Sequence, residues 1–236
     1  KPHNAFRGPY ESGVCKMMVV GLGKQTGAES VHSDGLGNMA RNLPANARVV
    51  LERSSILFAI PCVENAYDET SIIEAIPREA IMDREPELLK TAFSNMPGIL
   101  VGEADVLIVN EMGKNFSGTG VDPNISGTWS TEFGKGGLKV KRTCFLDLTD
   151  CSHGNANGMG LADIITARLY EKLDPKVIYP NCFTSTVLRS GMMPPVVATD
   201  KEAIQARIRT ANQIDRDNCR IIRIKNTLHV GEIMLS

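Results

Sequence analysis

The sequence predicts an α/β protein with largely parallel sheets flanked by helices, in two lobes with a cleft between them. Short apolar runs typical of strands alternate with longer stretches of helical spacing, which favours layered α/β architecture. The strongest of these runs, residues 104–110, leads directly into a glycine-rich loop. Met96, Pro97 and Gly98 interrupt the chain just before that run, so we expect a division into residues 1–97 and 98–236.

In the first part of the chain, proline and glycine punctuate residues 1–13 and predict a loop. Ser12 is a candidate cap for a short apolar element over 14–22. A helix is expected over 28–42, closed by Pro44. Short β-branched or aliphatic runs predict strands at 48–51 and 56–60, and apolar spacing predicts helices at 72–75 and 86–96.

In the second part, strands are expected at 104–110, 140–148 and 176–179. Apolar residues three and four apart predict a helix over 161–173, and a polar helix is expected over 201–216. Residues 220–224 and 228–235 complete the sheet as closing strands.

Composition excludes several classes of function. The formal net charge of −1 provides no basic field for nucleic acid or an anionic membrane surface. No apolar run approaches the roughly 20 residues of a membrane span. The six cysteines contain no C-x-x-C pair, which predicts reduced thiols in a cytoplasmic protein.

Potentially reactive side chains gather at three places in the sequence. Because ligands of open α/β sheets bind beyond the carboxyl ends of strands, the two places that follow strands are well sited. The three groups are His3 with Lys16 and His32, then Glu111 with Lys114, and finally Asp150, Cys151 and His153 in a run rich in Asn and Gly.

Two glycine-rich loops are weaker signals. Residues 21–27 match neither the dinucleotide fingerprint nor the phosphate-binding loop, and they favour a helix stop with close packing. Residues 118–124 resemble an anion-binding nest after a strand.

The spacing of the first group resembles the cofactor-carrying stretch of the lactate racemase family. The resemblance rests on Lys16 and His32, sixteen residues apart, with His3, residues 10–13 and the glycines of 21–23. It implies that Lys16 is joined through a thioamide to a nickel-pincer nucleotide, that His32 ligates the nickel, and that His3 is an acid/base. His3 requires a short insertion, because it lies thirteen residues before Lys16 where the family has about ten.

The resemblance extends to Glu111 and Lys114, which repeat the spacing of a Gln and a Lys that face the substrate in the family. Lys114 would hold a substrate carboxylate. Glu111 replaces a neutral amide with a potential anion, so the implied substrate is a larger hydroxy acid or a polyol acid rather than simply lactate.

The implied activity is that of a racemase or epimerase, an isomerase that removes a hydride from a 2-hydroxy acid and returns it through the nickel cofactor. Residues 1–97 would then be the remainder of an N-terminal, cofactor-carrying domain, and 98–236 a C-terminal α/β domain. The chain begins at Lys1 without a Met. The family's second acid/base histidine is expected before Lys1, so we expect this stretch by itself to be inactive and without cofactor.

Two alternatives stay open from the residues. The first is an α/β domain that binds a nucleotide or phosphate at 118–124 without redox chemistry. The second is a hydrolase or lyase that uses Asp150, Cys151 and His153 without nickel. In all three cases the partner is a small molecule, with no nucleic acid and no membrane.

Overall fold

The computed structural model describes residues 1–65, 67, 69–212, 214–215, 217–228 and 234–235. The chain folds as two compact units. The first contains Lys1–Met96 with the short returns Thr131–Gly134 and Thr184–Thr186, and the second contains Pro97–Ser130, Lys135–Phe183 and Val187–Ser236. The main change of unit, between Met96 and Pro97, lies one residue before the expected division.

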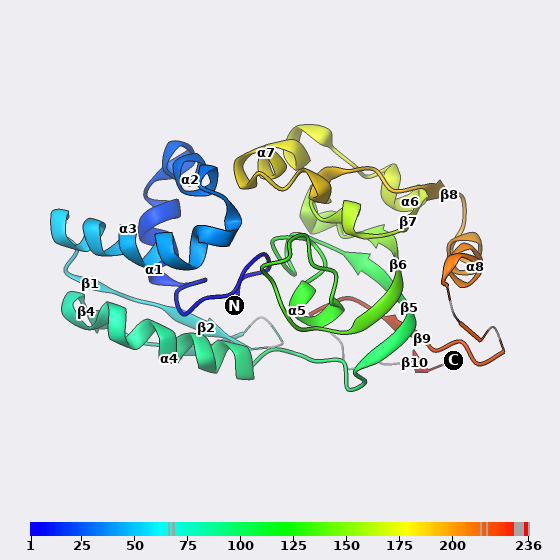
Figure 1. Cartoon of the computed structure of the whole chain (residues 1–236), viewed down its shortest axis with the longest axis horizontal. Coiled ribbons are helices and arrows are strands. Elements are labelled where there is room, and N and C mark those ends of the chain that lie inside the picture. Colours follow the sequence, from blue (N-terminus) through cyan, green and yellow to red (C-terminus); the bar gives the residue numbers. More distant parts are fainter. Residues whose placement is uncertain (66, 68, 213, 216, 229–233, 236) are drawn as a thin grey trace. The chain divides into compact units, whose positions relative to one another are not determined.

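The first unit is mainly helical. Helix α1 (Val14–Lys16) runs into a π-helical turn (Met17–Gly21), and α2 (Lys24–Ser33), α3 (Met39–Arg53) and α4 (Ile81–Ser94) follow (Figure 1). Two small antiparallel pairs join β1 (Phe58–Ala59) to β4 (Ile76–Pro77) and β2 (Cys62–Glu64) to β3 (Thr70–Ile73).

Helix α3 corrects two predictions. The helix expected over 28–42 is broken between α2 and α3, and the strand expected at 48–51 is the last part of α3. Every fourth residue of α3 is buried, namely Met39, Leu43, Ala47 and Leu51. Burial of this stripe stabilises the helix, which continues past Pro44 even though proline has no N–H to donate to the helical hydrogen bonds.

Two other local predictions in this unit were wrong, and a third was confirmed. Residues 72–75, expected as helix, begin with the last two residues of β3, where Ile72 pairs with Val63. Ser12 does not cap α1, because its hydroxyl donates to the carbonyl of Lys1. The helix expected at 86–96 is confirmed as α4, which begins earlier, at Ile81.

The second unit is built on a six-stranded sheet in the order β10-β9-β5-β6-β7-β8. Its strands are β5 (Glu103–Met112), β6 (Lys139–Leu148), β7 (Ile164–Thr166), β8 (Val196–Val197), β9 (Ile221–Ile224) and β10 (Met234–Leu235). The five strands from β9 to β8 are parallel, and only the edge strand β10 is antiparallel. The predicted α/β class with a largely parallel sheet is confirmed.

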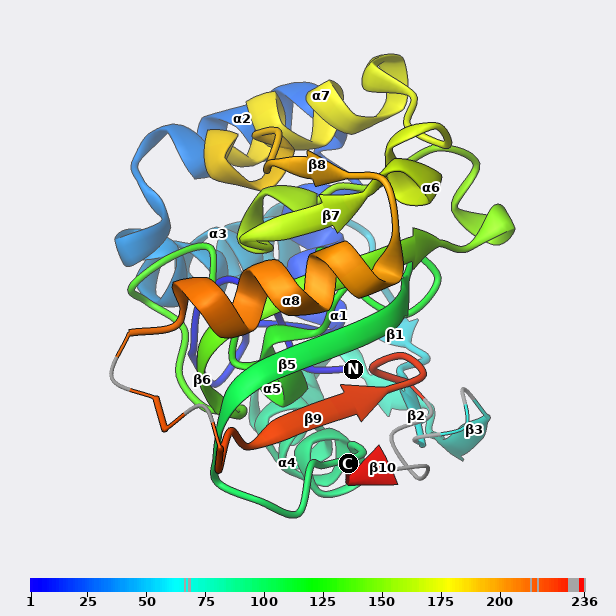
Figure 2. The same ribbon diagram turned by 90° about the vertical axis from the view of Figure 1, so that its right-hand side faces the viewer.

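Helices cover both faces of this sheet. Helix α8 (Asp200–Thr210) lies across the strands on one face, where Ala203 packs against Val106, Ile108, Cys144 and Leu146 (Figure 2). The short helix α5 (Pro123–Ser126) lies on the opposite face (Figure 1). Both faces of β5 and β6 are therefore buried, which explains their nearly continuous apolar sequence. No helix in the described part of the chain has the length and apolar character of a membrane span.

Between β6 and β8 the local predictions were wrong. Residues 161–173, expected as helix, contain β7 and the short helix α6 (Ala167–Tyr170), because Ile164 and Ile165 fill a buried place in the sheet. Residues 176–179, expected as strand, lie in helix α7 (Pro175–Ser185). Asp174 accepts a hydrogen bond from the Lys176 amide (2.9 Å), a typical start for a helix with proline at its first position.

The closing elements are shorter than expected. The helix predicted over 201–216 is confirmed as α8 but ends at Thr210, and β9 confirms the strand predicted at 220–224. Of the strand predicted at 228–235, residues 229–233 lie outside the described residues.

The order of the strands creates a switch point in the sheet. From β5 the chain steps outward through β6 and β7 to β8, and α8 then crosses back so that β9 pairs with the free side of β5. In open α/β sheets, ligands bind beyond the carboxyl ends of the strands at such a point. The carboxyl ends of β5 and β9 are therefore the place where a site is expected.

The loop before β7 is packed so closely that no side chain fits at Gly158. Gly158 has φ +101°, and a Cβ there would lie 1.7 Å from the carbonyl oxygen of Thr119. We expect Gly158→Ala to lower the free energy of unfolding by about 3–5 kcal/mol, because backbone strain adds to a clash with backbone. The matched variant Gly136→Ala has a similar φ of +103° with no atom near its Cβ, and should lose only about 1–2 kcal/mol. Urea unfolding measures both, and equal losses would contradict the packing argument.

Candidate functional site

His3 lies in the N-terminal loop of the first unit, next to the start of the predicted cofactor stretch. Its Nδ1 accepts a hydrogen bond from the Ala5 amide (3.1 Å), and its ring packs against Phe6 with centroids 4.5 Å apart. Burial lowers the pKa of His3 well below its usual range, and the positive charges of Lys16, His32 and Arg7 lower it further. Lys16 and His32 are thus each within electrostatic reach of His3, and His3 is neutral at pH 7.

The hydrogen bond from Ala5 also fixes the tautomer of His3. Because Nδ1 accepts, the proton of the neutral ring is on Nε2. In this arrangement Nε2 is a donor. Nδ1 can take up a proton only when its hydrogen bond from the Ala5 amide is broken. His3 can therefore hold or deliver a proton at a defined atom.

His32 lies near the end of α2 and is oriented as a metal-ligating histidine would be. Its Nδ1 is 2.6 Å from the carbonyl oxygen of Ala28. A carbonyl oxygen can only accept, so the proton of the neutral ring is on Nδ1 and the lone pair is on Nε2. A backbone acceptor on the second ring nitrogen is the usual partner of a metal-bound histidine.

Lys16 is the last residue of α1, directly before the π-helical turn. Single π-helical turns are rare and occur often at functional sites. The start of this helix is held by Glu85 of α4, whose Oε2 accepts from the Cys15 amide (2.8 Å). Gly23 lies between this turn and α2, and a Cβ there would lie 2.3 Å from the Val19 carbonyl oxygen, so the glycines of 21–27 permit close packing.

Two residues around His3 had no predicted role. Buried Glu11 accepts from the His3 amide (3.0 Å), from Arg7 Nη1 (3.1 Å) and, through Oε2, from the Gly8 amide (2.8 Å). Arg7 also donates to the His3 carbonyl (3.0 Å). The pair fixes the loop that carries His3. The sequence signal was Glu11 itself, an acidic residue inside the motif at 10–13.

Glu85 makes stability depend on pH in a defined direction. Burial raises the pKa of Glu85, although the amides of Cys15 and Val14 oppose this in part. A carboxyl with a raised folded pKa binds its proton more tightly when folded, so its contribution is greatest at low pH. The free energy of unfolding then falls as pH rises from about 4.3, the unfolded value, through the folded pKa.

We expect Glu85→Gln to make the loss of stability between pH 4 and 7 smaller than in the wild type. Urea unfolding at several pH values measures the slope, and Glu79→Gln, at an exposed position, controls for the change in net charge. An unchanged slope in Glu85→Gln would show that this carboxyl has the same pKa in the folded and the unfolded chain.

The described residues contain no group of three or more His, Cys, Asp or Glu side chains arranged to hold a metal ion. A metal bound by His32 would thus take its other ligands from elsewhere. With Nδ1 facing the Ala28 carbonyl oxygen, His32 could offer Nε2 as a single protein ligand.

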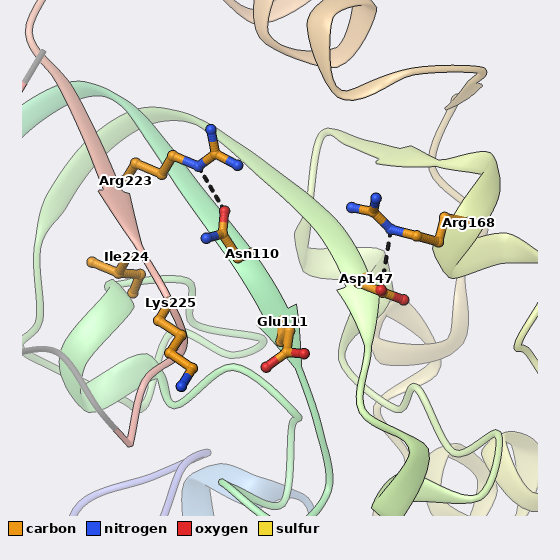
Figure 3. Close-up of a pocket in the computed structure, with 7 residues that line it drawn as sticks. All are labelled: Asn110, Glu111, Asp147, Arg168, Arg223, Ile224 and Lys225. Atoms are coloured by element: carbon orange, nitrogen blue, oxygen red, sulfur yellow. Dashed lines mark hydrogen bonds and ion pairs between the residues drawn. The ribbon is translucent and has the colours of Figure 1, made fainter. Parts of the chain in front are cut away.

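In the second unit, a pocket of about 460 Å³ opens at the carboxyl ends of β5, β6 and β9 (Figure 3). It occupies the switch point of the sheet, and its polar lining was not predicted apart from Glu111. Its lining residues are Asn110, Glu111, Asp147, Arg168, Arg223, Ile224 and Lys225. One feature of the sequence could have indicated this pocket: the apolar strands contain the polar residues Asn110, Asp147 and Arg223 inside or near their ends.

The charges of this pocket are partly compensated. Asp147 pairs with Arg168 (3.1 Å) and with Lys172 (3.0 Å), and Arg168 also pairs with Asp200 (3.1 Å). Arg223, in contrast, donates through Nε to the neutral Oδ1 of Asn110 (2.7 Å).

Lys114 does not line the pocket that contains Glu111. Its ammonium donates to the carbonyl of Gly118 (2.7 Å) and to Asn181 Oδ1 (3.0 Å), and burial lowers its pKa. The two residues that were expected to act together on one substrate are therefore not brought into one pocket.

The structure gives little support to the sites of the two alternative functions, phosphate binding and hydrolysis. In the loop 118–124, the Gly118 carbonyl accepts from Lys114 and Asn157, and the carboxylate of Asp122 is buried at the start of α5, which is unfavourable for phosphate. Asp150, Cys151 and His153 are exposed, and no side-chain hydrogen bond joins them within the described residues.

Comparison of the chain with models of known protein families, with curated proteins and with solved structures found no match.

Proposed function

We propose that this chain is part of an isomerase that racemises or epimerises a 2-hydroxy acid with a nickel-pincer nucleotide. The observation that carries the proposal is the electrostatic proximity of both Lys16 and His32 to His3, which lies up to 29 positions away in the sequence (3 to 32). The resemblance to the lactate racemase family selects the same three residues.

Each of the three residues has a chemical role that its surroundings support. Lys16 would carry the nucleotide through its side-chain nitrogen, on a helix whose start is held by Glu85. His32 would bind nickel through Nε2, because Nδ1 donates to Ala28. When bound, the cofactor would supply the acceptor of the substrate hydride.

His3 would manage the hydroxyl proton of the substrate. Its low pKa keeps the ring neutral at pH 7, so it is ready to accept a proton at Nδ1 once the Ala5 amide moves away. Glu11 and Arg7 position its backbone and are positioning residues rather than catalytic ones.

The second unit would supply the other substrate contacts across the cleft between two lobes that the sequence leads us to expect. Glu111 lines a pocket at the switch point of the sheet and would accept a hydrogen bond from a substrate hydroxyl. Lys114 would hold a carboxylate only after exchanging its bonds to Gly118 and Asn181. The proposal includes a cytoplasmic location, which the six free thiols support.

The test is mass spectrometry and metal analysis of the full-length protein, purified after co-expression with the enzymes that make the cofactor. We expect a covalent nucleotide adduct on Lys16 and bound nickel. Protein that carries neither under these conditions would refute the proposal, whereas nucleotide binding without an adduct would favour a phosphate-binding domain.

A further inference from the structure

The pocket at the carboxyl ends of β5, β6 and β9 has a charge pattern that defines a ligand. All seven lining residues that the structure describes belong to the second unit. The pocket lies where α8 has carried the chain back across the sheet, the position at which open α/β sheets bind ligands.

The uncompensated charge in the pocket is small and positive. Asp147 and Arg168 are neutralised by each other, by Lys172 and by Asp200. Within the described residues, the side chains of Arg223, Lys225 and Glu111 have no ion-pair partner in the folded chain, and their charges sum to +1. A ligand with a single negative charge balances this charge of +1. A phosphate dianion would leave one negative charge uncompensated in a pocket that also contains the carboxylates of Glu111 and Asp147.

The directions of the side chains separate two ends of the site. Arg223 and Arg168 point their guanidinium groups toward the same space, while the Glu111 carboxylate lies at the other end of the pocket (Figure 3). The Nε of Arg223 is held by Asn110, so its terminal nitrogens face the space in a fixed plane. A fixed guanidinium plane matches a carboxylate, and Glu111 matches a hydroxyl donor.

We propose that this pocket binds a monocarboxylate that carries hydroxyl groups and is larger than a three-carbon acid. Arg223 is the carboxylate partner, Asn110 positions Arg223, and Glu111 accepts from a hydroxyl. The volume of about 460 Å³ is within the range of small-molecule sites and accommodates a six-carbon acid with water. The choice of a hydroxy acid rests on the proposed function, with which the site shares Glu111, but binding at this pocket requires neither nickel nor the nucleotide.

The experiment measures binding by calorimetry to protein made without the cofactor pathway, so failure of nickel loading does not affect it. The probes are gluconate, lactate, glucose and glycerol 3-phosphate. We expect gluconate to bind more tightly than the other three. Arg223→Gln should weaken gluconate by about tenfold to a hundredfold, the loss of one charge-assisted contact. Arg209→Gln on α8 is the matched control, with gluconate binding as in the wild type.

A second variant keeps the test decisive if Arg223→Gln does not fold. Lys225 is exposed, and Lys225→Gln should weaken gluconate by about two- to tenfold without changing the thermal midpoint. Tighter binding of glycerol 3-phosphate would overturn the assignment in favour of a phosphate ester. No gluconate binding by folded wild type, or equal binding by wild type and both pocket variants, would overturn the site itself.

Discussion

Lys16→Ala should abolish covalent cofactor loading in the full-length enzyme and reduce activity to background, a loss of about 10⁶-fold or more. Under the proposed function, alanine removes the nitrogen that would carry the nucleotide. Lys16 ends α1 on a helix that is held by Glu85 and packed through Gly23, so the backbone should remain in place. Intact-mass spectrometry after co-expression with the cofactor-making enzymes checks loading.

Two further variants separate the role of Lys16 from a general effect. Lys24→Ala removes an exposed lysine of the same glycine-rich segment and should load as the wild type does. His32→Ala should keep the adduct but lose most of the nickel, because under the proposal Nε2 of His32 binds the metal while Nδ1 donates to the Ala28 carbonyl. An adduct of unchanged yield on the Lys16→Ala protein would eliminate the assignment.

His3→Asn should lower kcat by about 10²–10⁴, the usual contribution of one proton-transfer group. Asparagine is the matched replacement, because its side-chain oxygen can take the place of Nδ1 and accept from the Ala5 amide. The loop should therefore keep its shape while the titratable ring is lost. The measurement is the change of configuration of a panel of 2-hydroxy acids, followed by chiral chromatography.

The pH profile gives the same experiment a second readout. Because burial lowers the pKa of His3, wild-type activity should persist below pH 6.5 and fall only in more acidic solution. His3→Asn should lack this acidic limb. The exposed His153 serves as the control: His153→Asn should keep full activity, and a loss there instead would favour the hydrolase alternative.

The sequence by itself determined the elements in which local pattern and burial agree. The apolar runs at 104–110 and 140–148 predict β5 and β6, because strands buried on both faces contain few polar residues. The polar helix α8 and the strand β9 were also predicted. The spacing of the residues at positions 3, 16 and 32 led, through the resemblance, to a hypothesis about the chemistry of the first unit before any geometry was known.

Only the tertiary structure decided the elements whose local pattern is ambiguous. Residues 48–51 have the composition of a strand, but burial of the stripe from Met39 to Leu51 makes them helical. Residues 164–166 form β7 because a place is open in the sheet between β6 and β8. In such short segments, tertiary burial outweighs a propensity difference of less than about 1 kcal/mol per residue.

The candidate sites divide in the same way. Sequence spacing singled out Lys16 and His32, but it gave no information on the surroundings that make His3 neutral or fix the tautomer of His32. It paired Glu111 with Lys114, whereas the fold places Glu111 in one pocket with Arg223, more than a hundred residues further along the chain. The charges that share a pocket depend on which strands become neighbours, and the pairing of β5 with β9 is set by the return of α8 across the sheet rather than by any local pattern.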